Sequence, residues 1–248
     1  MRLGTTSTVE QSGALALLDS LHPPAIVAVV IAPSGQVLRS AAAGDLDVII
    51  THAPSLEQRL FVAPGHAQLR CPFVASRFAI VGPPADPAKI AGTASATDAL
   101  QRIAAARATF VSRGDSSGTH VKELALWQGA GVSPSPRGRP WYLETGSDQG
   151  ATLRLADERH GYALVDLPTF AKLKGVELRV LVAGDTALLN PYTLYVIRSP
   201  SPHPAAAAFA SWAMADWRTQ LLAMQLDGGG AAFEPLAGGC APPAPVEP

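Results

Sequence analysis

Short apolar runs alternate with stretches of helical periodicity along the chain, and this alternation limits the fold more than any other feature. The clearest run, residues 25–32 (AIVAVVIA), is continuous and rich in β-branched residues, which predicts a buried strand. Further strands are predicted at 46–50, 78–82, 109–112, 162–165, 178–182 and 193–197, and helices at 12–21, 96–107, 120–130, 150–160 and 204–226. Strands separated by helices of this length indicate an α/β fold with parallel sheets.

The composition favours a folded protein of one or two domains. A chain of 248 residues suits one large domain or two of about 100–150 residues each. With 48% hydrophobic and 16% charged residues, it can bury a sizeable core. The net charge of −1 lacks the basic surface expected of a nucleic-acid-binding protein, and no apolar stretch of about 18 residues is present to span a membrane.

The two ends and the two cysteines give weaker signals. No basic segment followed by an apolar one opens the chain, so we expect either an intracellular protein or a mature form without its leader. Cys71 and Cys240 are too few for a disulfide framework or a thiolate metal site. Two buried or idle thiols are the favoured interpretation, and a single bridge between them is the alternative. The Gly/Pro/Ala-rich tail is expected to be poorly ordered beyond Gly239, leaving 240–248 as a flexible end.

The first candidate for chemistry is the hydroxyl-rich segment that follows a short N-terminal strand. Residues 5–13 (TTSTVEQSG) contain two helix-start patterns, Ser7 with Glu10 and Thr8 with Gln11, each at capping-box spacing. A helix start exposes backbone N–H groups and a partial positive charge, which together suit an anion. An ordinary N-cap without a ligand is the simpler alternative.

The second candidate, residues 112–120 (SRGDSSGTH), also follows a predicted strand and opens a helix. Arg113 offers a planar fork of donors suited to oxyanions, and the neighbouring serines, threonine and glycines let the backbone close on a ligand. A polar turn is the alternative. Two hydroxyl-rich helix starts in different halves of the chain suggest a cleft that closes on one small oxyanion from both sides.

Two other kinds of chemistry fit the sequence less well. Gly114–Gly118 (GDSSG) resembles a serine-protease nucleophile motif, but Ser117 stands where that motif needs glycine, and a matching histidine motif is missing. A hydrolase using Ser116 or Ser117 is therefore a minor alternative. The six histidines, His52 and His120 among them, show no metal-ligand spacing, so no metal site and no cofactor are expected.

Several motifs in a fixed order resemble the substrate-binding proteins of tungstate ABC importers. They are TTST at 5–8, GDLDVIITHAP at 44–54, SRGDSSGTH at 112–120 followed by KEL at 122–124 and LW at 126–127, WYLETG at 141–146, GATL at 150–153 and NPY at 190–192. The resemblance covers most of the chain, and the combination is more specific than any single motif. It departs from the family at several points. Gly4 stands where members have a first threonine, Ser116 where they often have a second aspartate, Ser76-Arg77 where they have Asn-Asp, and Asp148-Gln149 where they have Gly-Met.

The resemblance implies a type II periplasmic-binding-protein fold, with two parallel-sheet α/β lobes joined by two crossover strands near 76–78 and 192–195. Lobe 1 would comprise 1–77 and 194–239, and lobe 2 would comprise 78–193. In such proteins the hydroxyl run, the arginine and the threonine six residues later contact the oxyanion. Carried over, these residues are Thr6, Ser7, Arg113 and Thr119, with Ser117, Gly150 and Ala151 as weaker candidates.

The resemblance also implies the protein's role and location. It indicates a non-enzymatic receptor, expected to be a monomer, that captures tungstate or molybdate in the interlobe cleft. It would deliver the oxyanion to the membrane permease of an ABC importer. A periplasmic or extracellular location is expected. A cytoplasmic oxyanion-sensing domain of similar fold is the alternative in another functional class.

Overall fold

The computed structural model describes residues 1–135 and 139–244, and its internal contacts divide the chain into two units. Unit 1 comprises Met1–Ser76 and Pro191–Pro248, and unit 2 comprises Arg77–Asn190. The chain passes from one unit to the other within strand β4 (Ala67–Gly82) and again within strand β9 (Leu189–Ile197). The lobe boundaries expected from the sequence, at 77/78 and 193/194, also lie within these two strands.

The sheet of unit 1 is mixed rather than parallel. Its strand order is β2-β1-β3-β9-β4-β10, with the new elements β2 at Ala28–Ile31, β1 at Arg2–Thr5, β3 at Val48–Thr51 and β10 at Glu234–Pro235. Strand β1 is parallel to β2 and β3, whereas β9 is antiparallel to β3, and β10 to β4. The expectation of parallel sheets is therefore correct for the N-terminal strands and wrong for the others.

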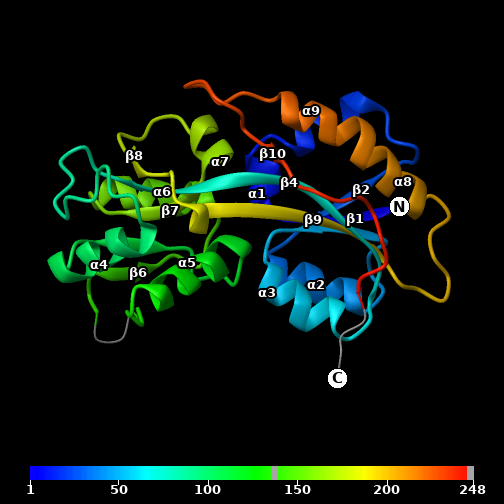
Figure 1. Ribbon diagram of the computed structural model, residues 1–248, viewed down its shortest axis with the longest axis horizontal. Helices are drawn as coiled ribbons and strands as arrows, with labels where there is room; N and C mark the ends of the chain where they lie inside the picture. The colour runs from blue at the N-terminus through cyan, green and yellow to red at the C-terminus, as the bar shows by residue number, and fades with distance from the viewer. Residues whose placement is uncertain (136–138, 245–248) are drawn as a thin grey trace. The chain divides into compact units, whose positions relative to one another are not determined.

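Helices cover both faces of this sheet, as Figure 1 shows. Successive residues of β3 point to opposite faces: Val48 packs in the apolar cluster that includes Trp217, and Ile49 in the cluster that includes Leu38. One face carries α2 and α3, and the other carries α8 and α9. The bounds of the unit 1 helices are Ser7–Gln11 (α1), Ser34–Ala42 (α2), Pro54–Glu57 (α3), Ala206–Trp212 (α8) and Arg218–Ala223 (α9).

Three details of unit 1 differ from the sequence prediction. The apolar run at 25–32 forms β2, but β2 is an edge strand, and Val30 is 44% exposed rather than buried. The helix predicted at 12–21 is a pair of 3-10 turns, Leu15–Leu17 and Asp19–Leu21. The long helix predicted at 204–226 is interrupted by a π-helical turn, Ala213–Trp217, between α8 and α9.

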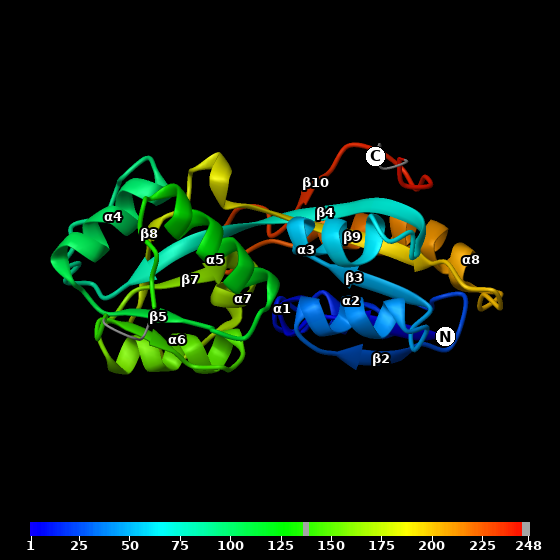
Figure 2. The ribbon, with the colours of Figure 1, turned by 90° about the horizontal axis from the view of Figure 1, so that it is seen from below.

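Unit 2 is a second α/β layer structure built on the last residues of β4. Phe78 and Ile80 face α4 and α5, whereas Ala79 and Val81 face α6, so helices again cover both faces (Figure 2). The unit's own strands are Phe110–Ser112 (β5), Tyr142–Glu144 (β6), Ala163–Asp166 (β7) and Arg179–Val182 (β8). Its helices are Ala96–Ala106 (α4), Gly118–Gly129 (α5), Gln149–Glu158 (α6) and Leu167–Lys172 (α7). Strands β5 and β6 are parallel, and β7 and β8 are antiparallel to β4.

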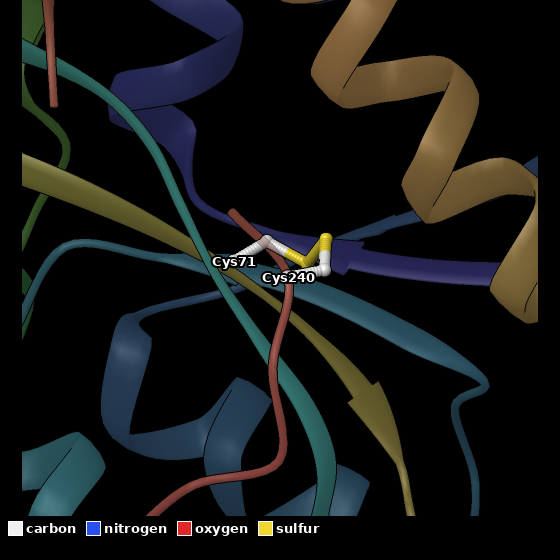
Figure 3. Close-up of a disulfide and its surroundings, with 2 residues drawn as sticks. All are labelled: Cys71 and Cys240. Atoms are coloured by element: carbon white, nitrogen blue, oxygen red, sulfur yellow. A yellow bond between two sulfur atoms is a disulfide. The ribbon is translucent and has the colours of Figure 1, made fainter. Parts of the chain in front are cut away.

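The cysteines and the C-terminal tail also correct the sequence prediction. Cys71 and Cys240 form a disulfide across 169 residues, so the favoured interpretation of idle thiols is wrong (Figure 3). Beside the bridge, Arg70 and Ala241 exchange backbone hydrogen bonds of 2.8 and 3.1 Å. The tail is therefore attached to β4 beyond Gly239. The last part of the expected flexible end, 245–248, lies outside the described residues, as does 136–138.

Candidate functional site

The hydroxyl-rich segment of unit 1 lies where β1 ends and α1 begins. Thr6 is the N-cap of α1: it is 1% exposed, and its Oγ1 accepts a hydrogen bond from the Val9 N–H at 3.4 Å. The first N–H groups of a helix have no partner within the helix, and those of Ser7 and Thr8 belong to this first turn. Thr5 is committed to the sheet, because its hydroxyl donates to the Ile50 carbonyl at 3.2 Å.

Close packing explains why glycine precedes these hydroxyl residues. A Cβ at Gly4 would lie 2.4 Å from Cδ1 of Leu46 and 3.1 Å from the side chains of Ile49 and Val37. These three residues belong to a buried apolar cluster. A threonine side chain at position 4 would therefore enter the core of unit 1. Glycine at this position thus removes no hydrogen-bond donor from the start of α1.

In unit 2, the loop between β5 and α5 buries an arginine together with a carboxylate. Nη2 of Arg113 lies 2.5 Å from Oδ2 of Asp115, and the two side chains are 3% and 10% exposed. The other carboxylate oxygen, Oδ1, accepts the Ser117 N–H at 3.0 Å. Asp115 thus balances the charge of Arg113 and also accepts a backbone hydrogen bond at the start of α5. This role of Asp115 was not predicted from the sequence, although Asp115 stands two residues after Arg113 in the same motif.

The first turn of α5 carries the two hydroxyl residues expected to bind an anion. Ser117 is the N-cap, and its Oγ accepts the His120 N–H at 3.2 Å. Thr119 is 1% exposed, and its Oγ1 has no hydrogen-bond partner among the described residues. A buried hydroxyl without a partner costs about 1–3 kcal/mol relative to a bonded one. Thr119 stands six residues after the buried Arg113, and a buried hydroxyl of this kind is one that a bound polar group can satisfy.

His120 supports the same loop from the helix side. Its Nδ1 accepts the Ser116 N–H at 3.1 Å, so in the neutral ring the proton is on Nε2. Burial lowers the pKa of His120, which favours this neutral form. Ser116 has a φ of 59°, in the left-handed region, and the bond to His120 holds this tight turn.

The start of α6 lies beside the Arg113 loop within unit 2. The backbone N–H of Thr145 donates to the Ser112 carbonyl at 3.0 Å, and that of Gly146 donates to the Arg113 carbonyl at 2.8 Å. Asp148 is the N-cap of α6 and accepts the Ala151 N–H at 2.9 Å. The acid that departs from the family pattern is therefore a helix cap, and it occupies the Ala151 amide. An Asp just before a predicted helix is an N-cap signal that could have shown this.

The structure therefore groups the predicted site residues in two sets. Unit 2 brings together Arg113, Ser117 and Thr119 on one loop and helix start, with the α6 start that carries Gly150 and Ala151 next to that loop. Thr6 and Ser7 form the helix start of unit 1.

Other chemistries find little support in the same residues. The Ser117 hydroxyl accepts a backbone N–H, and His120 accepts a backbone N–H rather than a serine hydroxyl, so neither bond is that of a nucleophile to its base. Within 1–135 and 139–244, no group of three His, Cys, Asp or Glu side chains is placed to hold a metal ion. Over the same ranges, no helix is both long enough and apolar enough to cross a membrane.

Comparison with known proteins identifies the family. A family model described as "PBP superfamily domain" matches residues 2–216. A Haloferax volcanii protein named for anion binding in an ABC transporter is 39% identical over 216 residues, which are 82% of this chain and 61% of that protein. The tungstate-binding protein TupA of Peptoclostridium acidaminophilum is 33% identical over 233 residues, which are 89% of this chain and 79% of TupA.

A solved structure gives the same result at the level of the fold. The chain is 38% identical to a structure described as the tungstate ABC transporter from Geobacter sulfurreducens, with a TM-score of 0.75. The match covers 87% of this chain and 93% of that one. The expected type II periplasmic-binding-protein fold is thereby confirmed. From its sequence and its fold, this chain belongs to the PBP superfamily.

Proposed function

We propose that this chain is the substrate-binding protein of an ABC importer and that it captures tungstate or molybdate. The observation that carries the proposal is the helix start of α5. There a buried arginine lies within one loop and turn of a buried hydroxyl that has no hydrogen-bond partner among residues 1–135 and 139–244. The relatives from Haloferax volcanii and Peptoclostridium acidaminophilum are named for anion and tungstate binding, which supports the choice of ligand.

Arg113, Thr119 and the start of α5 are the oxyanion-binding groups of unit 2 in this proposal. Thr6 and Ser7 are the candidate groups of unit 1. Gly150 contributes its N–H at the start of α6, whereas Ala151 contributes only if Asp148 releases its amide. The Ser117 hydroxyl is committed to capping, so Ser117 serves through its backbone.

The charges of these groups suit a small dianion. Each helix start adds a partial positive charge of at most about 0.5. Arg113 adds one full charge, which Asp115 balances until a ligand takes its place. Burying a dianion is costly unless its charge is countered and its oxygens are hydrogen-bonded, so a full set of donors is required. A fully deprotonated oxyanion matches donors better than a protonated one such as hydrogen phosphate.

Isothermal titration of the chain with tungstate, molybdate, sulfate and phosphate tests the proposal directly. We expect the first two oxyanions to bind far more tightly than the last two. Replacing Arg113 with Ala should weaken tungstate binding about 30-fold or more, because removing a buried charge partner costs about 2–5 kcal/mol. Equal, weak binding of all four oxyanions would refute the proposed function.

The location and the partners follow from the same proposal. A disulfide persists in oxidising compartments, so the Cys71–Cys240 bridge supports a periplasmic or extracellular site of action over the cytoplasmic sensor. The partner is then the membrane permease of the importer, and the receptor acts as a monomer without enzymatic activity. A smaller radius of gyration in X-ray scattering with tungstate bound is expected if the two units close on it.

A further inference from the structure

A buried carboxyl group, Glu123, lies directly behind the Arg113 loop and has no part in the proposed site. It stands on α5 one helical turn after Thr119 and is 2% exposed. Its Oε1 accepts the Tyr142 hydroxyl at 2.8 Å and the Trp127 indole N–H at 3.2 Å. A carboxyl group is rarely buried so deeply unless it is hydrogen-bonded, so this network requires a reason.

The network continues into the loop through Ser112. The Ser112 hydroxyl forms a hydrogen bond with the Glu123 carboxyl group, and its Oγ accepts the Gly114 N–H at 3.3 Å. The same hydroxyl also forms a hydrogen bond with the Tyr142 hydroxyl, which itself donates to Glu123. One carboxyl group thus connects helix α5, the end of β5 and the residues on both sides of Arg113.

The charged groups around Glu123 are few. Burial raises its pKa to about 7, and the carboxylate of Glu144 on β6 acts in the same direction, while the three hydrogen-bond donors lower it. Burial also raises the pKa of Tyr142, which therefore remains a donor. The loop itself carries the Arg113–Asp115 ion pair. His120 lies in the first turn of α5, and burial lowers its pKa.

We propose that Glu123 is a positioning residue for oxyanion binding, which holds the Arg113–Gly114 turn through Ser112 and whose charge modulates the affinity for a dianion. The inference rests on the proposed function, because it takes Arg113 to bind the oxyanion. A dianion on one side of the turn repels a carboxylate on the other. Binding near neutral pH is therefore accompanied by uptake of a proton at Glu123, and affinity falls as Glu123 ionises.

Three variants separate the positioning role from the charge. Glu123→Gln keeps an oxygen that accepts the Trp127 and Tyr142 donors but carries no charge. Ser112→Ala keeps Glu123 but removes its connection to Gly114. His120→Gln is the control for the pH dependence, because it removes the neighbouring imidazole. Since His120 also holds the Ser116 turn, the affinity of this variant is compared only with its own value at other pH.

The experiment is a calorimetric titration with tungstate between about pH 6 and 8, in buffers of different ionisation enthalpy, so that proton uptake is measured directly. For the unaltered chain we expect proton uptake and an affinity that falls severalfold across this range. Glu123→Gln should abolish both effects, and His120→Gln should retain them. Ser112→Ala should weaken binding about tenfold at every pH. Because it also removes two buried hydrogen bonds, it should lower the unfolding temperature, so binding is measured well below the unfolding transition.

The possible results distinguish the inference from the function on which it rests. If the unaltered chain binds tungstate, but Glu123→Gln takes up protons as before and Ser112→Ala binds with full affinity, Glu123 has no such role and the proposed function stands. If the unaltered chain binds none of the oxyanions, both proposals fail together.

Discussion

The carboxylate of Asp115 lies 2.5 Å from the guanidinium of Arg113, and its second oxygen accepts the Ser117 N–H. Asp115 therefore uses the two kinds of donor, a guanidinium and a helix-start amide, that an oxyanion would use. Both members of the pair are almost fully buried, so their charges cancel in a medium that screens poorly. If Arg113 binds the oxyanion as proposed, the oxyanion would compete with Asp115 for these donors.

Replacing Asp115 with Asn should therefore lower the stability of the free chain and increase its response to ligand. The buried Arg113 would lose its counter-charge, and breaking a buried pair by removing one partner costs about 3–5 kcal/mol. Tungstate would restore a negative charge, so the rise in unfolding temperature on adding it should exceed that of the unaltered chain. Thermal unfolding with and without tungstate measures both effects.

The exposed pair of Asp98 and Arg102 on α4 provides the matched control. Its side chains are 46% and 48% exposed at a separation of 3.1 Å, so Asp98→Asn should change neither the stability of the free chain nor the response to ligand. If Asp115→Asn gives the same temperature increment on ligand binding as the unaltered chain, the oxyanion does not compete with Asp115.

Replacing Thr119 with Val should weaken oxyanion binding while leaving the fold intact. Valine has nearly the same shape, and the hydroxyl that it removes has no partner among the described residues, so the free chain loses no hydrogen bond. Losing a donor to a charged ligand costs about 1.5–3 kcal/mol, or roughly 10- to 150-fold in affinity. Calorimetric titration and thermal unfolding of the same sample measure the two quantities.

Thr152 on α6 provides a control, because its hydroxyl, unlike that of Thr119, has hydrogen-bond partners whose loss should affect stability. Its hydroxyl bonds to the Asp148 carbonyl at 2.8 Å and to the Thr145 hydroxyl at 2.9 Å. Thr152→Val should therefore lower the unfolding temperature. A Thr119→Val variant that loses stability but keeps full affinity would show that the Thr119 hydroxyl serves the fold and not the ligand.

Removing the disulfide should lower stability while leaving ligand binding unchanged. Cys71 and Cys240 bridge strand β4 and the tail, both within unit 1, and close a loop of 169 residues. Bridges typically contribute about 2–4 kcal/mol, mainly by restricting the unfolded chain. Cys240→Ser, or a reducing agent, should lower the unfolding free energy by about that amount, and the unfolding temperature should fall with it. A fall in tungstate affinity instead would link the tail to the site.

The sequence predicts well what depends on local pattern. The motif 112–120 correctly gave a strand, a loop and a helix start, because all three are determined by neighbouring residues. The predicted strands at 46–50 and 193–197 also exist. Burial was harder to predict: the run at 25–32 is as apolar as a central strand, yet β2 lies at the edge of the sheet, since its place depends on residues far away in the chain.

Long-range pairing was outside the reach of sequence patterns for the same reason. The first two thirds of β4 were missed, because Arg70 and Pro72 interrupt the apolar pattern of a strand that alternates between buried and exposed residues. The bridge between Cys71 and Cys240 depends on the tail returning to β4, which no local signal predicts. In the candidate site, the hydroxyl residues and Arg113 could be recognised from the sequence. Their hydrogen-bond and ion-pair partners could be identified only from the structure.

The unfolding free energy should fall as pH rises through the titration of Glu123, and Glu123→Gln should remove this dependence. Burial raises the pKa of Glu123 from 4.5 to about 7, so between these values the folded chain holds a proton that the unfolded chain has lost. The contribution to stability is complete below about pH 4.5 and is lost by about pH 7; 2.5 pKa units correspond to about 3 kcal/mol. Burial also raises the pKa of Glu57, which therefore acts in the same direction. The contribution of Glu123 is isolated by subtracting the unfolding free energy of Glu123→Gln from that of the unaltered chain at each pH. Urea unfolding at about pH 5 and pH 8 measures this difference, and a variant that is no more stable than the unaltered chain at the higher pH would show that Glu123 ionises without cost to the fold.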